Sequence, residues 1–132
     1  MNLDAIPPLE KLGIELKHCN GVTAAFFLPY DGNQNDKNTV FAGSQYSALV
    51  IAGWYLVGVW AEQNSLGDKV AIKEGNVSYP KAAHSDVTVT ARFDETPNKR
   101  PSGHYKSIVR IEARDEDGDL VSQLIADYRI LL

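Results

Sequence analysis

The sequence predicts an α+β domain in which one long buried helix is wrapped by a curved antiparallel sheet of about five to six strands. Residues 42–64 carry almost no charge, and their apolar side chains occur on all sides of a helix. Beyond Gly67 the apolar period changes to two, which is the period of half-buried strands. Because one face of a flat sheet cannot cover such a helix, we expect a strongly curved sheet and a second subunit that covers the remainder.

The elements are expected in the following order. Residues 5–12 predict a short helix with two prolines in its first turn. Asn20-Gly21 predicts a two-residue hairpin turn, and 29–38 is a loop rich in Asp, Gly and Asn before the long helix at about 42–64. The segment 94–103 is expected as a loop between strands. The expected strands lie at about 14–19, 21–29, 68–82, 86–93, 104–114 and 120–132.

Length and composition narrow the class of protein. The 132 residues suit a single domain, 1–132, and 44% hydrophobic residues are enough for a core. A net charge of -4 argues against a nucleic-acid partner. The apolar stretch 48–61 is too short for a membrane span, so no membrane partner is expected. One cysteine, Cys19, and no visible signal peptide favour a reducing, cytoplasmic location.

Several segments together carry a resemblance to a known family. They are Asn35, Thr39, the Phe-Ala-Gly-Ser element at 41–44, the Ala-Gly-Trp triplet at 52–54 and the strand region 76–91. With this element order, the chain resembles the hotdog-fold thioesterase superfamily. Within it, the chain is most similar to the thioesterase family typified by a domain that is fused behind acetyltransferase domains. The resemblance extends over nearly the whole chain.

The resemblance implies an acyl thioesterase that acts on acyl-CoA or on an acyl-carrier protein, as a homodimer or a tetramer. The backbone amides of Ala42 and Gly43 would polarise the thioester carbonyl, which agrees with the unpaired N–H groups and partial positive charge of a helix start. Gly43 lacks the side chain that would block a close approach. Coenzyme A would enter only as part of the substrate, with no other cofactor and no metal. The acyl chain would lie against aromatic residues on or before the helix, namely Phe41, Tyr46, Trp54 and Tyr55.

One feature of many such thioesterases is missing. They carry a carboxylate nine residues after the start of this motif, where the present chain has Val50. Asp36 is the best substitute for a base, although it also fits an exposed loop residue. Asn35 fits either a ligand for substrate or water, or an Asx turn. Ser44 and Ser47 fit either contacts to substrate or first-turn packing.

Further polar residues are candidates for a helix cap, for the site or for a metal. Thr39 or Asn38 is expected to cap the helix. Glu74 is a minor candidate for reaching the site across a dimer. The acidic turn 115–119 lacks the glutamate of a calcium loop and is expected to be a solvated hairpin turn. Three histidines stand outside any metal-ligand pattern and outside the helix, which argues against a metal site and against dehydratase chemistry: His18, His84 and His104.

Lys81, Lys99 and Arg100 are candidates for contacts to the phosphates of coenzyme A, or are ordinary solubilising charges. Two functions therefore remain open. The first is thioester hydrolysis with the helix start as oxyanion hole. The alternative is a non-catalytic hotdog dimer that binds acyl thioesters or lipids, which the missing helical carboxylate favours.

Overall fold

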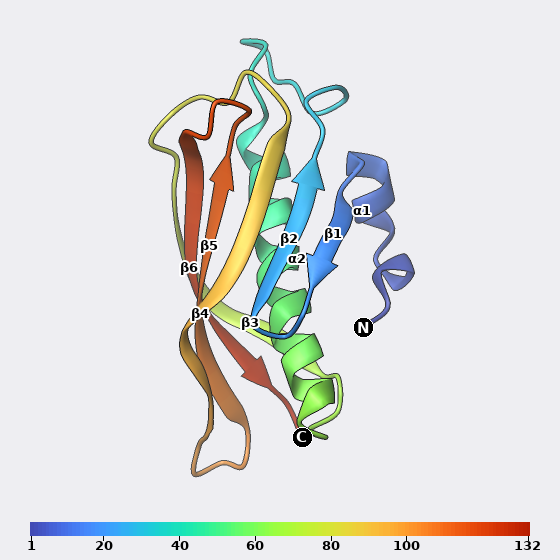
Figure 1. The fold of residues 1–132 in the computed structure, drawn as a ribbon, viewed down its shortest axis with the longest axis vertical. Helices are drawn as coiled ribbons and strands as arrows, with labels where there is room; N and C mark the ends of the chain where they lie inside the picture. Colours follow the sequence, from blue (N-terminus) through green and yellow to red (C-terminus); the bar gives the residue numbers. More distant parts are fainter.

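The computed structural model describes residues 1–132 and has one long helix packed against a six-stranded antiparallel sheet (Figure 1). This architecture confirms the predicted fold class. Its elements are η1 (Leu3–Ala5), α1 (Pro7–Leu12), β1 (Glu15–Cys19), β2 (Thr23–Leu28), α2 (Ala42–Gln63), β3 (Val70–Ser78), β4 (Val87–Lys99), β5 (Tyr105–Arg114) and β6 (Leu120–Ile130).

The strands follow the order β1-β2-β4-β5-β6-β3, and every neighbouring pair is antiparallel. The sheet therefore has two free edges, β1 and β3. Figure 1 shows the start of α2 at the same end of the molecule as the turn between β5 and β6, and the turn between β4 and β5 at the opposite end. The alternation predicted for β4 is present, since Val87, Val89 and Ala91 are buried and the residues between them are exposed.

A tyrosine of the sheet makes a close contact with α2 near the middle of the helix. Tyr128 of β6 is fully buried and donates a hydrogen bond from its hydroxyl to the backbone oxygen of Val50, at 2.7 Å. Gly53 makes room for this ring, because a Cβ at that position would come within 2.4 Å of the phenol oxygen. The Ala-Gly-Trp triplet of the sequence thus serves helix–sheet packing.

The sheet buries one side of α2 more completely than the other. Six apolar residues of the helix have no exposed surface: Ala48, Leu49, Ala52, Leu56, Val57 and Ala61. Tyr46, Val50 and Trp54 are only partly buried. An apolar stripe of α2 therefore remains without full cover in a single chain.

The predicted end of β4 was wrong. β4 continues to Lys99 through the segment expected as a loop, because Glu95, Asn98 and Lys99 pair with residues of β5. Its pairing is irregular on both sides of Glu95, so Pro97 costs no regular ladder hydrogen bond. Lys99 itself pairs with Tyr105 instead of lying in a loop.

The first hairpin also differs in detail. Three residues separate β1 from β2, where two were expected. The side-chain oxygen of Asn20 accepts hydrogen bonds from the amides of Val22 and Thr23, both at 2.8 Å, and Gly21 takes the left-handed conformation at φ 84°. The Asn-Gly pair therefore makes the turn, with one residue more than the shortest hairpin needs.

The N-terminal segment forms a 3-10 turn, η1, and a separate short helix, α1, in place of one helix at 5–12. Ile6 lies between the two with a non-helical backbone. No helix of the chain is both long enough and apolar enough to span a lipid bilayer.

Candidate functional site

The start of α2 has no side-chain cap. Phe41 is the N-cap residue and makes no capping hydrogen bond, so the predicted caps were wrong. Thr39 instead accepts a hydrogen bond from the side chain of Asn35, and Asn38 turns the chain with a left-handed φ of 59°. The backbone amides of residues 42–44 consequently find no acceptor within the chain.

A buried asparagine that the sequence did not single out holds the segment before α2. Asn33 is 3% exposed, and its side-chain amide donates to the carbonyls of Leu12 and Pro29 at 2.8 and 2.9 Å. Its backbone carbonyl accepts the amide hydrogen of Phe41 at 2.7 Å. Asn33 therefore joins the end of α1, through its side chain, to the N-cap residue of α2, through its backbone. In the sequence, Asn33 is one of several polar loop residues, and its burial had no visible signal.

Gln45, in the first turn of α2, is a second buried polar residue that holds the start of this helix. It is 3% exposed and donates from Nε2 to the carbonyl of Val40 at 3.1 Å. Val40 in turn donates its amide hydrogen to the carbonyl of Ala83, in the connection between β3 and β4, at 2.8 Å. The start of α2 is thus fixed to two other parts of the chain while its own amides remain free.

Two aromatic rings flank the free amides. Phe41 is 54% exposed, and its ring lies so close to Gly43 that a Cβ there would come within 2.5 Å of it. Tyr79 donates from its hydroxyl to the carbonyl of Ala42 at 2.9 Å. Gly43 therefore does leave room for a close approach, and in this structure the ring of Phe41 takes part of that room.

An apolar groove with a volume of about 380 Å³ runs along α2 from its second turn. Its walls come from α1 and the segment before it, from one face of α2 and from the edge strand β3. The lining residues are Ile6, Pro8, Leu9, Tyr46, Ser47, Val50, Ile51 and Ile72. Ser47 lies one helical turn after Gly43 and donates from its hydroxyl to the Gly43 carbonyl at 3.0 Å. The groove therefore lies along the helical face that begins with Gly43.

Among the residues that the sequence proposed, the structure brings Tyr46 and Ser47 to the groove. It does not bring the polar loop there. The side chain of Asn35 accepts the amide hydrogens of Lys37 and Thr39, which is the Asx-turn alternative. The side chain of Asp36 is 83% exposed, and its carboxylate lies 3.2 Å from the Lys37 ammonium.

Three residues of α2 point elsewhere. Ser44 is 5% exposed and buried among neighbours. Trp54 donates from its indole N–H to the carbonyl of Val70 at 3.1 Å, which ties α2 to the beginning of β3. Tyr55 packs edge-on against Phe26 of β2, with ring centroids 5.6 Å apart.

Glu74 of β3 lines a small hollow together with Lys106 and Asp127, apart from the residues of the apolar groove. Within one chain its carboxylate is therefore not part of the groove wall. The walls that the N-terminal segment and β3 contribute, Ile6 and Ile72 among them, were missed from the sequence. Neither residue belongs to a motif, and only the folded chain brings them beside α2.

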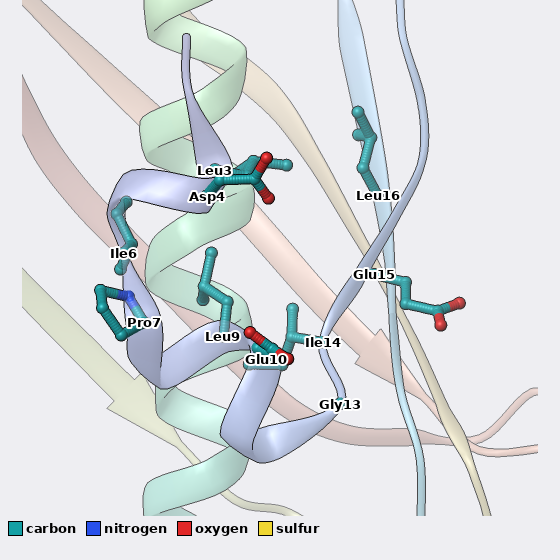
Figure 2. Close-up of a pocket in the computed structure, with 10 residues that line it drawn as sticks. All are labelled: Leu3, Asp4, Ile6, Pro7, Leu9, Glu10, Gly13, Ile14, Glu15 and Leu16. Carbon is teal, nitrogen blue, oxygen red and sulfur yellow. The ribbon is translucent and has the colours of Figure 1, made fainter.

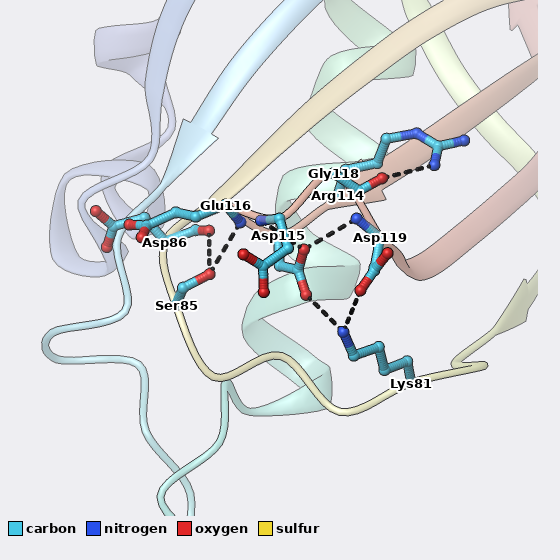
Figure 3. Close-up of polar contacts among 9 residues, drawn as sticks. Lys81, Ser85, Asp86, Arg114, Asp115, Glu116, Gly118 and Asp119 are labelled. Atoms are coloured by element: carbon cyan, nitrogen blue, oxygen red, sulfur yellow. Dashed lines mark hydrogen bonds and ion pairs between the residues drawn. The ribbon is translucent and has the colours of Figure 1, made fainter.

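Lys81 is held by carboxylates in this chain. Its ammonium group lies 3.1 Å from Asp115 and also contacts Asp119, in the turn between β5 and β6 (Figure 3). The ammonium donates a hydrogen bond to each carboxylate, and these bonds, first the one to Asp119 and then the one to Asp115, raise the pKa of Lys81. Lys99 and Arg100 have no carboxylate partner within the chain and lie at the turn between β4 and β5. The three cations therefore do not form one cluster in a single chain.

The acidic turn is a hairpin turn, as the sequence predicted. Oxygen atoms of Asp115, Asp117 and Asp119 lie within 4.8 Å of one another, which is close enough to hold a cation. One oxygen of Asp115, however, already accepts the amide hydrogens of residues 117 and 119, and the other binds Lys81. The lysine thus supplies the positive charge at this turn.

A larger cavity, of about 590 Å³, lies between the N-terminal helices and β1, and no residue of α2 lines it (Figure 2). Figure 2 shows Asp4 and Glu10 on the helical side of this cavity and Glu15 on the strand side. No basic residue lines it. A cavity whose charged residues are all acidic is a poor site for an anionic ligand such as coenzyme A, so the smaller apolar groove is the better candidate.

A comparison with known proteins identifies the family of the chain. Residues 2–118 match the model of the family described as "Putative thioesterase (yiiD_Cterm)". The match includes the free amides at the start of α2 and every residue that lines the apolar groove.

Solved structures share the fold at low sequence identity. A putative thioesterase from Shewanella oneidensis has a TM-score of 0.85 and 19% identity, covering 98% of this chain and 90% of that one. A thioesterase from Haemophilus influenzae has a TM-score of 0.79 and 15% identity, covering 94% and 82%. The PaaI protein of the Escherichia coli phenylacetic acid degradation operon has a TM-score of 0.80 and 13% identity, covering 98% and 87%. These likenesses show the hotdog fold.

The acidic turn leads to a prediction about pH. The amide of Asp119, followed by Lys81, holds the pKa of Asp115 below its ordinary value of 3.8. A lowered pKa means that the ionised carboxylate stabilises the fold above that value, and that this contribution is lost as the pH falls through the lowered pKa. We expect Asp115→Asn to unfold at lower urea concentration than the wild type at neutral pH, with a difference that shrinks in acid.

Urea unfolding at about pH 7 and at about pH 2.5 measures this difference. Asp117→Asn is the matched control, because the Asp117 carboxylate accepts no hydrogen bond and forms no ion pair in the chain. An Asp115→Asn defect of equal size at both pH values would contradict the expectation.

Proposed function

Because the chain belongs to this thioesterase family, we propose that it hydrolyses acyl thioesters, with coenzyme A or an acyl-carrier protein as the thiol carrier. One observation carries the proposal: the uncapped amides at 42–44 stand beside an apolar groove of about 380 Å³. Amides that point at a developing oxyanion stabilise the tetrahedral intermediate of acyl transfer. An apolar groove next to them suits the hydrocarbon part of an acyl group.

The proposed reaction proceeds by attack of water on the thioester carbon. The carbonyl oxygen becomes an oxyanion that receives hydrogen bonds from the amides of Ala42 and Gly43. The carbon–sulfur bond then breaks, and the departing thiolate takes up the proton that the attacking water gives up, so that a carboxylic acid and a thiol leave. The acyl chain lies along Tyr46, Val50 and Ile72, and Phe41 moves from Gly43 as the thioester enters.

We propose that the working form is a homodimer whose two copies pair along β3. This strand is a free edge, Ile72 on it is 36% exposed, and the apolar groove beside it is open to solvent. Antiparallel pairing around a two-fold axis would turn the partner end to end. The partner's turn between β4 and β5, with Lys99 and Arg100, would then come to the end where α2 starts, where it could meet the phosphates of coenzyme A.

A second function is favoured by Val50, which stands where related enzymes carry a carboxylate. Without that group the same groove and amides would bind an acyl thioester without turning it over. This alternative is a hotdog dimer that binds acyl thioesters or lipids.

For the location we propose the cytoplasm. The single cysteine, Cys19, is unpaired and half-buried. Burial raises the pKa of its thiol, which keeps it protonated and unreactive. Free thiols of this kind are typical of proteins in a reducing compartment.

The main test is free-thiol release from a panel of acyl-CoAs that runs from short to long chains and includes aryl groups. We expect saturable release, with a preference among chain lengths that reflects the size of the apolar groove. No release from any substrate, together with calorimetric binding of acyl-CoA, would favour the binding module instead. If neither release nor binding were seen with coenzyme A, the same panel on an acyl-carrier protein would decide whether the proposal stands.

The dimer has a direct test in sedimentation velocity. We expect a mass of twice the 14.5 kDa of the chain. Replacing the edge residue Ile72 by a charged one, as in Ile72→Glu, should shift the protein towards monomer, because like charges would meet across the two-fold axis. A wild-type protein that sediments at the mass of one chain would contradict the proposed pairing.

Asp36 remains the sequence-based candidate for the base, and Asp36→Asn tests it. Because its carboxylate is exposed and lies beside Lys37, we expect kcat/KM to fall by less than about threefold. Asp31→Asn, in the same loop, is the matched control. A loss well above tenfold in Asp36→Asn alone would establish Asp36 in the site and overturn the expectation.

A further inference from the structure

The apolar groove offers a substrate few polar groups. Of its eight lining residues, only Tyr46 and Ser47 have polar side chains. The Ser47 hydroxyl already donates its hydrogen to the carbonyl of Gly43 at 3.0 Å. A thioester in the groove would therefore find one uncommitted side-chain donor, the phenol of Tyr46.

The position of Tyr46 suits a group that acts beside the free amides. It follows Gly43 by three residues and so lies on the same helical face. Side chains on a helix lean back towards its N-terminus, which directs the ring of Tyr46 towards the first turn of α2. Its hydroxyl lies against Gly75 of β3, where an added Cβ would come within 3.1 Å of it. Gly75 thus leaves space for the hydroxyl between α2 and the edge strand.

The neighbouring phenols differ from Tyr46 in one respect. Tyr128 donates to the carbonyl of Val50 at 2.7 Å, and Tyr79 donates to the carbonyl of Ala42 at 2.9 Å. Burial raises the pKa of both phenols, and the nearby Tyr46 raises each of them further. Of these three tyrosines that lie close together, only Tyr46 has no hydrogen-bond partner in the chain.

We infer that the Tyr46 hydroxyl donates a hydrogen bond to the carbonyl oxygen of a thioester bound in the apolar groove. This inference rests on the proposed function. As water adds to the carbon and the carbonyl electron pair moves to oxygen, the neutral phenol and the amides of Ala42 and Gly43 share the oxyanion. The phenol keeps its proton while the carbon–sulfur bond breaks. In a groove with no carboxylate at Val50, such donors provide the catalysis that remains.

A purely structural role makes a different prediction. If Tyr46 acted only as an apolar wall, the removal of its oxygen would leave the ring, the groove and the rate nearly unchanged. Tyr46→Phe makes this change and keeps the aromatic ring. Tyr105→Phe is the matched control, because Tyr105 is also half-buried and without a hydrogen bond, and it begins β5 beside Lys99.

The first readout is turnover of the best acyl-CoA by the dimeric protein. We expect Tyr46→Phe to lower kcat by about 100- to 1,000-fold, with KM within about twofold of wild type, as for the loss of one oxyanion donor. Tyr105→Phe should match the wild type in both constants. Thermal unfolding of each variant shows whether the fold is intact.

The second readout does not need turnover. It compares calorimetric binding of two stable analogues: a ketone in which a methylene group replaces the thioester sulfur, and the thioether that lacks the carbonyl oxygen. We expect Tyr46→Phe to weaken the ketone by roughly fivefold, the size of one hydrogen bond, and to leave the thioether unchanged.

These readouts separate the two claims. A wild type that binds the ketone through Tyr46 but releases no thiol would refute hydrolysis and support the role of Tyr46. A wild type that turns over, with Tyr46→Phe equal to it in kcat and in ketone binding, would refute the role of Tyr46 and leave hydrolysis in place. Equal weakening of ketone and thioether would show a packing role and would also overturn the inference.

Discussion

The need to cover a nearly uncharged 22-residue helix governs this molecule. Six strands cover one side of α2, and the ring of Tyr128, seated over Gly53, holds helix and sheet together. The stripe that includes Tyr46 and Val50 is left for α1, for the edge strand β3 and, as we propose, for a second copy of the chain. The apolar groove is thus a consequence of incomplete cover, and the same incomplete cover favours both a dimer and an acyl ligand.

The start of α2 is held in place by neighbouring segments but has no side-chain cap. A helix start usually uses a nearby side chain to satisfy its amides. Here Thr39 bonds to Asn35, while Asn33 and Gln45 bind carbonyls of neighbouring segments. The helix is held in place and its first amides remain available, which is the arrangement that an oxyanion site requires.

The sequence predicted what local pattern controls. The uniform apolar character of α2 and the alternation of β4 follow from side-chain period, and both were confirmed. It did not predict what depends on contacts between distant segments. The extension of β4 to Lys99 depends on its pairing with β5, and the groove walls at Ile6 and Ile72 depend on how the N-terminal segment and β3 lie beside α2. The absence of a cap could not be predicted either, because Thr39 is a suitable capping residue by type. Only the structure shows that its hydroxyl accepts a hydrogen bond from Asn35.

The central claim is that an acyl thioester presents its carbonyl oxygen to the first amides of α2. The most direct measurement is a titration of ¹⁵N-labelled protein with the stable ketone analogue, followed in the amide spectrum. We expect the largest saturable shifts at Ala42, Gly43 and Ser44, with smaller ones along the apolar groove at Val50 and Ile72. Shifts confined to the acidic cavity between the N-terminal helices and β1, or absent from 42–44 at saturation, would contradict the account.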